Sequence, residues 1–126
     1  MKTIINTNNA PAPIGPYSQA VSAGSFIFVS GQIALNPVTG QLVTDDIKTE
    51  TKQVMDNINA ILVEAGVDFS NIVKTSIFLT DMQNFAQVNE VYGTYFKDAF
   101  PARETVQVAG LPKGVNVEIT VTAIKP

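Results

Sequence analysis

The side chains with the clearest chemical potential lie between Pro101 and Glu118, in a stretch that contains Arg103, the only arginine among 126 residues. Polar and apolar residues alternate over positions 103–108 and again over 115–123, and this alternation predicts two β-strands. The glycines and the proline between the two segments predict a connecting turn. A unique guanidinium is therefore expected on a strand, close in sequence to a second strand that carries a carboxylate.

The two strands are predicted to pair as an antiparallel hairpin, with Val108 opposite Val115. In this register Arg103 lies diagonally from Glu118, at a spacing of roughly 7–8 Å that the two side chains can bridge. A slip of one residue would instead send them to opposite faces. The commoner role of such a pair is an exposed ion pair worth about 0–1 kcal/mol. The other role is a cleft in which a guanidinium and a carboxylate flank a small anionic ligand.

The residue census restricts the chemistry that such a cleft could perform. The chain has no histidine and no cysteine, so it lacks the commonest general base, the commonest thiol nucleophile and the usual metal ligands other than carboxylates. Any catalysis must come from carboxylates, lysine, tyrosine, hydroxyl groups, the single arginine or the backbone. We therefore expect no metal site.

Length and charge give the class of protein. A chain of 126 residues that is 45% hydrophobic suits one domain spanning residues 1–126. A net charge of −3, with the cationic residues dispersed along the chain, argues against a nucleic-acid partner. The N-terminal residues resemble no signal peptide, and no stretch approaches the ~20 apolar residues of a membrane span. We expect a soluble, cytoplasmic protein without a membrane partner.

Two further residues have both a structural and a functional interpretation. Tyr17 follows a stiff, proline-rich segment; such a tyrosine usually packs in the core or on the surface, but this one could also be fixed at the rim of a pocket. Gly31 ends an apolar β-run that starts at Ser25. It either occupies a turn or bulge or leaves bare backbone for a ligand to approach.

The remaining elements are two helices and several strands. Positions 46–65 predict a helix that begins at Asp45 or Asp46 and ends at Gly66, with Glu50 on its solvated face. Strands are expected near positions 3–5, 20–29 and 72–79. A second helix is expected from about 85 to 96, and Gly93 inside it suggests close packing there.

This order of elements predicts an α+β fold in which two helices cover one face of a single sheet. The uncovered face is expected to carry Arg103, Thr105, Gln107 and Glu118. Because those side chains suit neither a dry core nor open solvent, we expect other copies of the chain to cover this face and to form clefts between subunits.

Four motifs resemble those of the RidA (YjgF/YER057c/UK114) family, and the resemblance covers essentially the whole chain. They are Ile-Gly-Pro-Tyr-Ser-Gln-Ala at 14–20, Val-Ser-Gly-Gln-Ile at 29–33, Asp-Met-Gln-Asn-Phe-Ala-Gln-Val-Asn at 81–89, and Pro-Ala-Arg at 101–103 followed by Leu-Pro-Lys-Gly and Val-Glu-Ile. The resemblance implies a chorismate-mutase-like subunit in a homotrimer with three inter-subunit clefts and no cofactor. It also implies hydrolysis of reactive 2-imino acids, such as 2-iminopropanoate and 2-iminobutanoate, to 2-oxo acids and ammonia. These intermediates are released by pyridoxal-phosphate enzymes and damage other enzymes of that class.

The resemblance also assigns roles to individual residues. Arg103 matches the family's carboxylate-binding arginine and Glu118 its water-activating glutamate. The substrate-binding positions fall on the backbone amide of Thr105 and on Tyr17, Gly31 and Asn89. Two positions depart from the family pattern: Glu104 replaces a typically small residue, and Thr105 stands where some members have cysteine. The threonine is expected to be harmless if only its amide is used, and strand alternation is expected to point Glu104 away from the site.

Three functions remain open from the sequence. In the deaminase, Arg103 holds the substrate carboxylate while Glu118, with a pKa raised by partial desolvation, moves protons between water and the departing amine. A non-catalytic module would keep the arginine clamp and bind 2-oxo acids without turnover. Some members of the family are described as translation-inhibiting ribonucleases, but the acidic composition and the lack of histidine argue against that activity.

Overall fold

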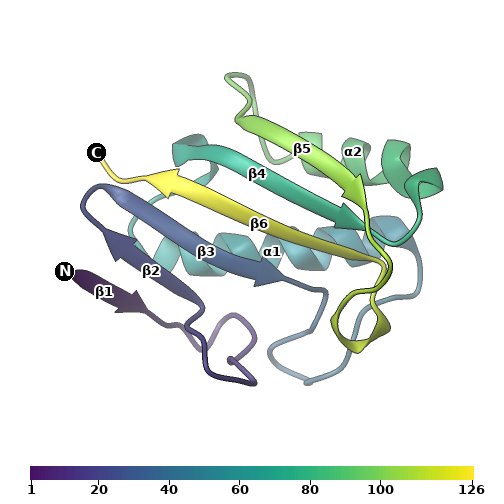
Figure 1. The fold of residues 1–126 in the computed structure, drawn as a ribbon, viewed down its shortest axis with the longest axis horizontal. Helices are drawn as coiled ribbons and strands as arrows, with labels where there is room; N and C mark the ends of the chain where they lie inside the picture. The colour runs from purple at the N-terminus through teal and green to yellow at the C-terminus, as the bar shows by residue number, and fades with distance from the viewer.

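The computed structural model describes residues 1–126 as one six-stranded sheet with two helices behind it (Figure 1). The strand order is β1-β2-β3-β6-β4-β5, and only the β4–β5 pair is parallel. The strands are β1 (Lys2–Ile5), β2 (Ala20–Ala23), β3 (Phe26–Gln32), β4 (Ile72–Leu79), β5 (Ala102–Gln107) and β6 (Val117–Ile124). The predicted α+β class, with both helices on one face of one mixed sheet, is confirmed.

The predicted hairpin between β5 and β6 is wrong. β6 lies in the centre of the sheet between β3 and β4, whereas β5 is an edge strand paired only with β4. The helical crossover between β4 and β5 brings the chain back to the same end of the sheet, so β5 runs parallel to β4. β6 takes the central place because four of its side chains are fully apolar and buried, and β5 has no comparable set. The residues in question are Val117, Ile119, Val121 and Ala123.

The long helix α1 (Ile47–Glu64) begins and ends where the sequence predicts. Asp46 caps its N-terminus, because its carboxylate accepts a hydrogen bond from the Thr49 amide at 2.8 Å. The chain leaves the helix through Gly66, whose φ of 80° favours glycine. The apolar stripe of α1 packs against the sheet and supplies much of the core, including Val54, Met55, Ile58, Ile61 and Leu62.

The second helix, α2 (Phe85–Gly93), is shorter than predicted and ends at Gly93 instead of continuing to position 96. The suggestion of close packing at Gly93 is also wrong, because a Cβ added there would meet no atom within 4 Å. Phe96 and Tyr95 lie beyond the helix and pack against the core together with Phe69. Both residues therefore contribute to the core although neither belongs to the helix.

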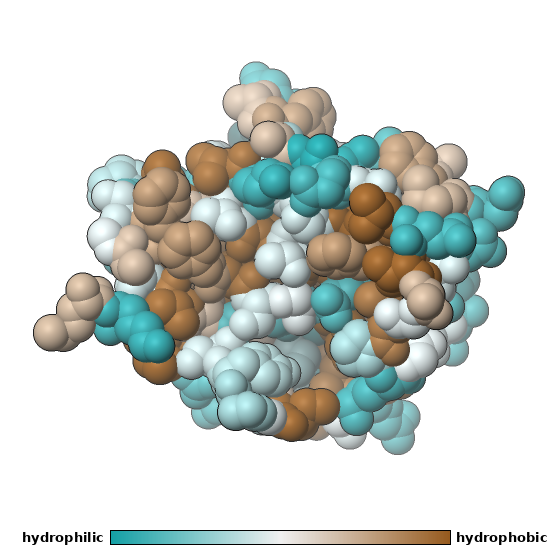
Figure 2. Space-filling view, viewed as in Figure 1, coloured by the Kyte–Doolittle hydropathy of each residue, from teal (hydrophilic) through white to brown (hydrophobic).

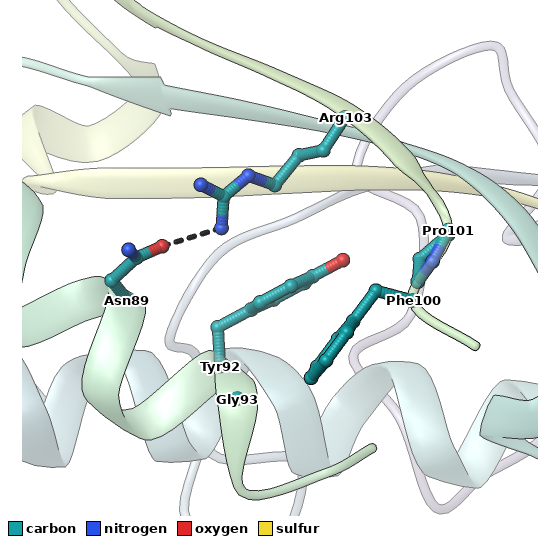
Figure 3. A pocket seen from close by; sticks show the side chains of 6 residues that line it. All are labelled: Asn89, Tyr92, Gly93, Phe100, Pro101 and Arg103. Carbon is teal, nitrogen blue, oxygen red and sulfur yellow. Dashed lines mark hydrogen bonds between the residues drawn. The ribbon is translucent and has the colours of Figure 1, made fainter. Parts of the chain in front are cut away.

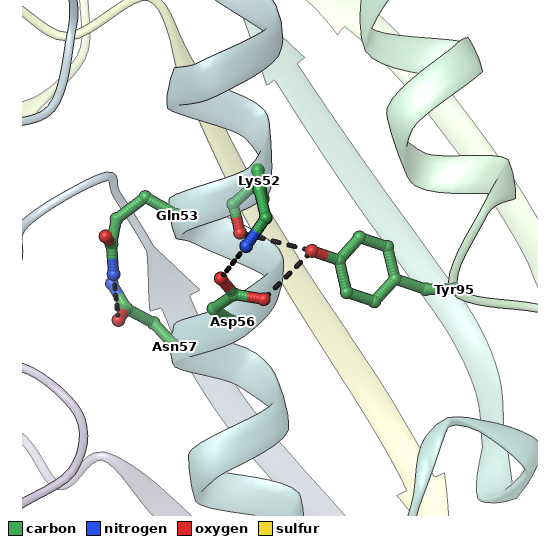
Figure 4. Close-up of polar contacts among 5 residues, drawn as sticks. All are labelled: Lys52, Gln53, Asp56, Asn57 and Tyr95. Atoms are coloured by element: carbon green, nitrogen blue, oxygen red, sulfur yellow. Dashed lines mark hydrogen bonds and ion pairs between the residues drawn. The ribbon is translucent and has the colours of Figure 1, made fainter.

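Polar side chains of α1 fasten neighbouring segments to the helix (Figure 4). Asp56 accepts a hydrogen bond from the Tyr95 hydroxyl at 2.9 Å and pairs with Lys52 at 2.7 Å. Burial, followed by the proximity of Asp56, raises the pKa of Tyr95 far above its usual range, so its hydroxyl stays protonated and keeps donating. The buried side chain of Asn57 accepts from Gln53 and donates to the carbonyls of Ile33 and Leu35, which fixes the loop after β3.

The face of the sheet turned away from the helices is open (Figure 2). It mixes apolar and polar side chains, and several of its large apolar residues are markedly exposed, namely Ile4, Phe26, Phe28, Val106 and Ile124. The Lys74–Glu104 ion pair at 2.9 Å lies on the same face. That copies of the chain cover this face stays a prediction.

Neither helix of the fold combines the length and the apolar character needed to cross a lipid bilayer.

Candidate active site

The predicted site residues fall into two groups on opposite faces of the sheet. Arg103 aligns with Thr75 of β4, whose buried side chain faces the helices. Glu118 aligns with Phe78, three positions further along β4, and so projects from the open face. The expected approach of Arg103 and Glu118 within one chain, and the placing of Arg103, Thr105 and Gln107 on the open face, are therefore wrong. The error follows from the predicted hairpin. β5 pairs with β4 instead, and this register turns Arg103, Thr105 and Gln107 toward the helices.

The guanidinium of Arg103 is held against α2 (Figure 3). It donates a hydrogen bond from Nη1 to Oδ1 of Asn89 at 2.5 Å. Its Cζ atom lies 5.2 Å from the ring centre of Tyr92 and 5.7 Å from that of Phe85, within the range of cation–π attraction. No carboxylate of the chain pairs with it. Neutral groups therefore orient the guanidinium, and its positive charge remains available to pair with an anionic ligand.

This guanidinium lines a hollow of about 510 Å³, here called the arginine cleft. Its walls are Asn89, Tyr92, Gly93, Phe100, Pro101 and Arg103. The ring of Tyr92 is held at its hydroxyl end, because the hydroxyl donates a hydrogen bond to the Thr75 side chain at 2.9 Å. Burial raises the pKa of Tyr92, and the Thr75 hydrogen bond and the Arg103 charge only partly oppose this effect. Tyr92 therefore serves as a neutral platform for the cation.

The backbone of β5 adds donors beside Arg103. The Val108 amide donates to the Leu79 carbonyl at 2.8 Å, so alternate residues of β5 turn their amides toward β4. The amides of the intervening residues, Arg103 and Thr105, accordingly face the open edge of the sheet. The Thr105 hydroxyl is also the one buried side-chain polar atom without a hydrogen-bond partner. A small anion at this edge could meet both the guanidinium and the Thr105 amide.

Glu118 occupies a second hollow of about 420 Å³, here called the glutamate cleft. Its walls are Ile14, Tyr17, Ser30, Gly31, Ile33, Pro112 and Glu118. The Glu118 carboxylate has no hydrogen-bonding or charged partner, and partial burial raises its pKa above the ordinary value of 4.5. A carboxyl group in this state is suited to accept and return a proton.

Two of the predicted residues shape the glutamate cleft. Gly31 lies at the irregularity in the pairing of β3 with β6, and a Cβ there would come within 2.6 Å of the Glu118 carboxylate. A side chain at this position would therefore displace the Glu118 carboxylate from its observed place, whereas the backbone of Gly31 is not left-handed. Tyr17 is 51% exposed and stands at the rim, as its functional interpretation proposed. Ser30 is tied to the Ser18 carbonyl, which holds the tyrosine segment against β3.

Glu104 points away from the arginine cleft, as strand alternation predicts. It contacts Lys74 and Ser76 on the open face, and the Ser76 hydrogen bond, followed by the Lys74 contact, lowers its pKa. It therefore stays ionised beside a cation and does not compete for Arg103.

Sequence reasoning missed several residues that hold the site. Tyr92 and Phe85 are absent from the predicted site, although their spacing from Asn89 on α2 places all three on the side that meets β5. Glu50 was placed on a solvated face but is fully buried. It accepts hydrogen bonds from the Asn116 amide, the Asn116 side chain and the Val117 amide at 2.8, 2.7 and 3.2 Å. No group of three carboxylates comes together in a way that could hold a metal.

Known proteins resemble this chain over almost its whole length. The sequence model described as Endoribonuclease L-PSP matches residues 7–125. The 2-iminobutanoate/2-iminopropanoate deaminase of Mus musculus is 49% identical over 125 residues, which cover 99% of this chain and 93% of the mouse protein. A putative endoribonuclease from Thermotoga maritima is 48% identical with a TM-score of 0.97, covering 100% of this chain and 99% of its own. E. coli TdcF, solved with bound serine, is 42% identical with a TM-score of 0.94, covering 98% and 99% of the two chains. The chain therefore belongs to the RidA family, for which the matching sequence model carries the endoribonuclease description.

Proposed function

We propose that this protein hydrolyses 2-imino acids and their enamine tautomers to 2-oxo acids and ammonia, in clefts that join Arg103 of one copy to Glu118 of another within a homotrimer. One observation carries the proposal. The chain presents an oriented guanidinium and a partly buried carboxyl group, neither of which has a partner of opposite charge, on opposite faces of one sheet. Two such groups can meet only across a contact between copies.

In this scheme the arginine cleft binds the substrate carboxylate. The planar fork of Arg103 makes two charge-assisted hydrogen bonds, each worth about 1.5–3 kcal/mol, and the Thr105 amide adds a third donor. Asn89 and Tyr92 hold the fork in place, so little rotamer freedom is lost on binding.

Glu118 carries the proton transfers. It accepts a proton from a water molecule as the water oxygen bonds to the carbon of the protonated imine, which yields a neutral carbinolamine. Protonated Glu118 then gives the proton to the amine nitrogen. The carbon–nitrogen bond breaks and ammonia leaves, while the hydroxyl group passes its proton to the ionised Glu118 and becomes the carbonyl of the 2-oxo acid. Glu118 then gives this proton to the ammonia, which departs as ammonium. Because the pKa of Glu118 is raised, it lies closer to neutral pH than that of an ordinary glutamate, and the carboxyl group can both take and return a proton more readily.

The names and contents of the related proteins support this reaction. The mouse relative is named for the deamination of 2-iminobutanoate and 2-iminopropanoate, and TdcF was solved with serine, which carries a carboxylate of the kind that Arg103 is proposed to bind. We infer that the substrates come from pyridoxal-phosphate enzymes that release imines, and that hydrolysis protects other enzymes from them. The reaction itself calls for no cofactor, because a protonated imine is already electrophilic.

The test compares wild type with Arg103→Ala and Glu118→Gln on 2-iminopropanoate generated in situ from alanine by an amino-acid oxidase. We expect kcat/KM to fall by about 10²–10⁴-fold in each variant, from the loss of the carboxylate clamp or of the proton acceptor. Lys125→Ala, which removes an exposed cation elsewhere, serves as the matched control and keeps full activity.

Two outcomes would contradict the assignment. Binding of 2-oxobutanoate by a wild-type protein that releases no ammonia would make it a ligand-binding module. RNA cleavage that survives both substitutions would support the endoribonuclease description of the family.

A further inference from the structure

One wall of the glutamate cleft is a segment without regular secondary structure. The chain between β1 and β2 contains no helix and no strand, and it contributes Ile14 and Tyr17 to the cleft. These two side chains are 70% and 51% exposed, so core packing does not hold them. A segment of this kind must be held by hydrogen bonds from elsewhere in the chain.

The side chain of Gln19 supplies such bonds from a buried position. Gln19 is 2% exposed and directly precedes β2. Its Oε1 atom accepts a hydrogen bond from the Thr7 amide at 2.7 Å. Its Nε2 atom donates to the carbonyls of Thr7, Ala10 and Pro11 at 3.0, 3.3 and 2.9 Å. One side-chain amide thus joins four backbone groups of residues 7–11 to the start of β2.

The backbone of Gln19 ties the other end of the segment to β3. Its carbonyl accepts a hydrogen bond from the Ser30 amide at 2.9 Å. Residues 11–19 therefore form a loop that is closed at Pro11 by the Gln19 side chain and anchored to β3 by the Gln19 backbone. A smaller hollow of about 40 Å³ has Gln19 in its wall and shares residues with the glutamate cleft, Gly31 among them. The Gln19 amide therefore lies close to that cleft.

Burial is the only cause that raises the pKa of Glu118, because no charged side chain of the chain faces it. Tyr17 is the only other titratable residue in the walls of the glutamate cleft. β3 carries no charged residue, and β4 places Phe78 beside Glu118. The charged residues on the other elements around the cleft lie outside its walls; they are Lys74, Glu104 and Lys113. In the proposed trimer Arg103 of another copy is added, and it is common to wild type and Gln19 variants alike.

From these contacts we propose that Gln19 is a positioning residue for the proton transfer: its amide holds residues 11–19 over the cleft and keeps the Glu118 carboxyl group partly out of bulk water. This inference rests on the proposed function, since it takes Glu118 as the proton acceptor. Gln19 itself lies outside the cleft and acts through the two side chains of the loop. When the loop is released, water reaches the carboxyl group, and the pKa of Glu118 moves back toward its ordinary value of 4.5.

The experiment removes the hydrogen bonds of Gln19 in two ways. Gln19→Ala deletes the side chain, whereas Gln19→Met fills almost the same volume without the amide. We expect the acid limb of the pH profile of kcat/KM for 2-iminopropanoate to move to lower pH in both variants, because a hydrated carboxyl group ionises more readily. The value at neutral pH should fall about 10–100-fold, because the wall of the site is no longer held in place. Ile61→Ala is the control for lost stability; Ile61 is fully buried on α1 and lines neither cleft, so this variant keeps the wild-type acid limb.

Direct titration of Glu118 separates the positioning role from the reaction. Carbon-13 NMR follows the glutamate carboxyl groups, and the signal that is absent from Glu118→Gln identifies Glu118. A lower titration midpoint in both Gln19 variants than in wild type supports the proposal, even if wild type hydrolyses no imine and the proposed function fails. Unchanged midpoints and acid limbs overturn it. A Gln19→Met protein that matches wild type also overturns it, because the volume of the side chain and not its hydrogen bonds would then hold the loop.

Discussion

Two charged residues of this protein, Arg103 and Glu118, have no partner of opposite charge within one chain. Arg103 is oriented by an amide and two aromatic rings, all of them neutral. Glu118 fits into space that exists only because residue 31 is glycine, and it has no partner at all. A charge without a counter-charge costs stability where it is partly buried. The persistence of both groups is best explained by a ligand that pairs with one and reacts at the other.

The pKa of Glu118 predicts a pH dependence of activity. Because partial burial raises this pKa above 4.5, the ionised base is lost at a higher pH than for an ordinary glutamate, and kcat/KM should fall early as the solution is acidified. The same shift means that the neutral form favours the fold, so stability is lost as the pH rises through the raised pKa. Rate profiles and denaturation midpoints between pH 4 and 8 measure both effects.

Glu118→Gln should remove the stability trend over this range, because an amide does not titrate. Glu64→Gln, which changes an exposed carboxylate on α1, should leave both profiles as in wild type. A Glu118→Gln protein with the wild-type stability profile would show that another group titrates, and the assignment of the base to Glu118 would then lose its support.

At the scale of elements, the position of each strand decides which groups reach the clefts. β5 is an edge strand, so the amides of Arg103 and Thr105 remain free for a ligand. β6 is central, so Glu118 is carried on a strand whose alternate residues are buried in the core. The Glu118 side chain therefore projects from a strand in the interior of the sheet, which is paired on both sides.

The start of β6 depends on Glu50, and this dependence gives a prediction about stability. Glu50→Ala would leave two backbone amides and the Asn116 side chain without an acceptor, and we expect a loss of about 2–4 kcal/mol in the free energy of unfolding. Urea denaturation measures this loss. The amide of Asn116 precedes Glu118 by two residues, so activity should fall as well.

Glu50→Gln is the matched variant. One oxygen can still accept from both backbone amides, and the new amide nitrogen can donate to Asn116 once the Asn116 side chain is flipped. We expect this change to cost less than about 1 kcal/mol. A loss equal to that of Glu50→Ala would mean that the negative charge, and not the hydrogen-bond geometry, holds the strand.

At the scale of the whole molecule, the two clefts of one chain cannot act together. Arg103 faces the helix layer and Glu118 faces the open side of the sheet, where exposed apolar side chains are available for contact (Figure 2). Closed symmetric assembly would place the arginine cleft of one copy next to the glutamate cleft of another. It would also cover apolar surface that is unusual on a protein that remains a monomer.

Mixing two inactive variants tests this arrangement. When Arg103→Ala and Glu118→Ala are unfolded, mixed in equal amounts and refolded together, some inter-subunit clefts receive an intact Arg103 from one variant and an intact Glu118 from the other. Random assembly should restore about a quarter of the wild-type activity. Each variant refolded alone is the control. If both groups acted within one copy, the mixture would remain inactive.

The sequence by itself determined the class of fold, most element boundaries and the residues worth testing. Alternation and helical periodicity are local properties, so β4, α1 and a cap at Asp45 or Asp46 could be predicted directly, and the structure shows that the cap is Asp46. The residue census likewise singled out Arg103, the only arginine, whereas Glu118 was identified from the predicted strand pairing and from the family resemblance.

Only the tertiary structure decided how these residues are arranged. Strand pairing joins residues far apart in the chain, so nothing local showed that β6 would lie between β3 and β4 or that β5 would run parallel. The predicted pairing of β5 with β6 wrongly placed Arg103 and Glu118 on the same face, because successive side chains of a strand point to opposite faces of the sheet. Burial of Glu50 and free space at Gly93 depend on what packs against each helix, which periodicity does not record. The site is divided between two faces because the sheet sets the direction of each side chain by its position along the strand.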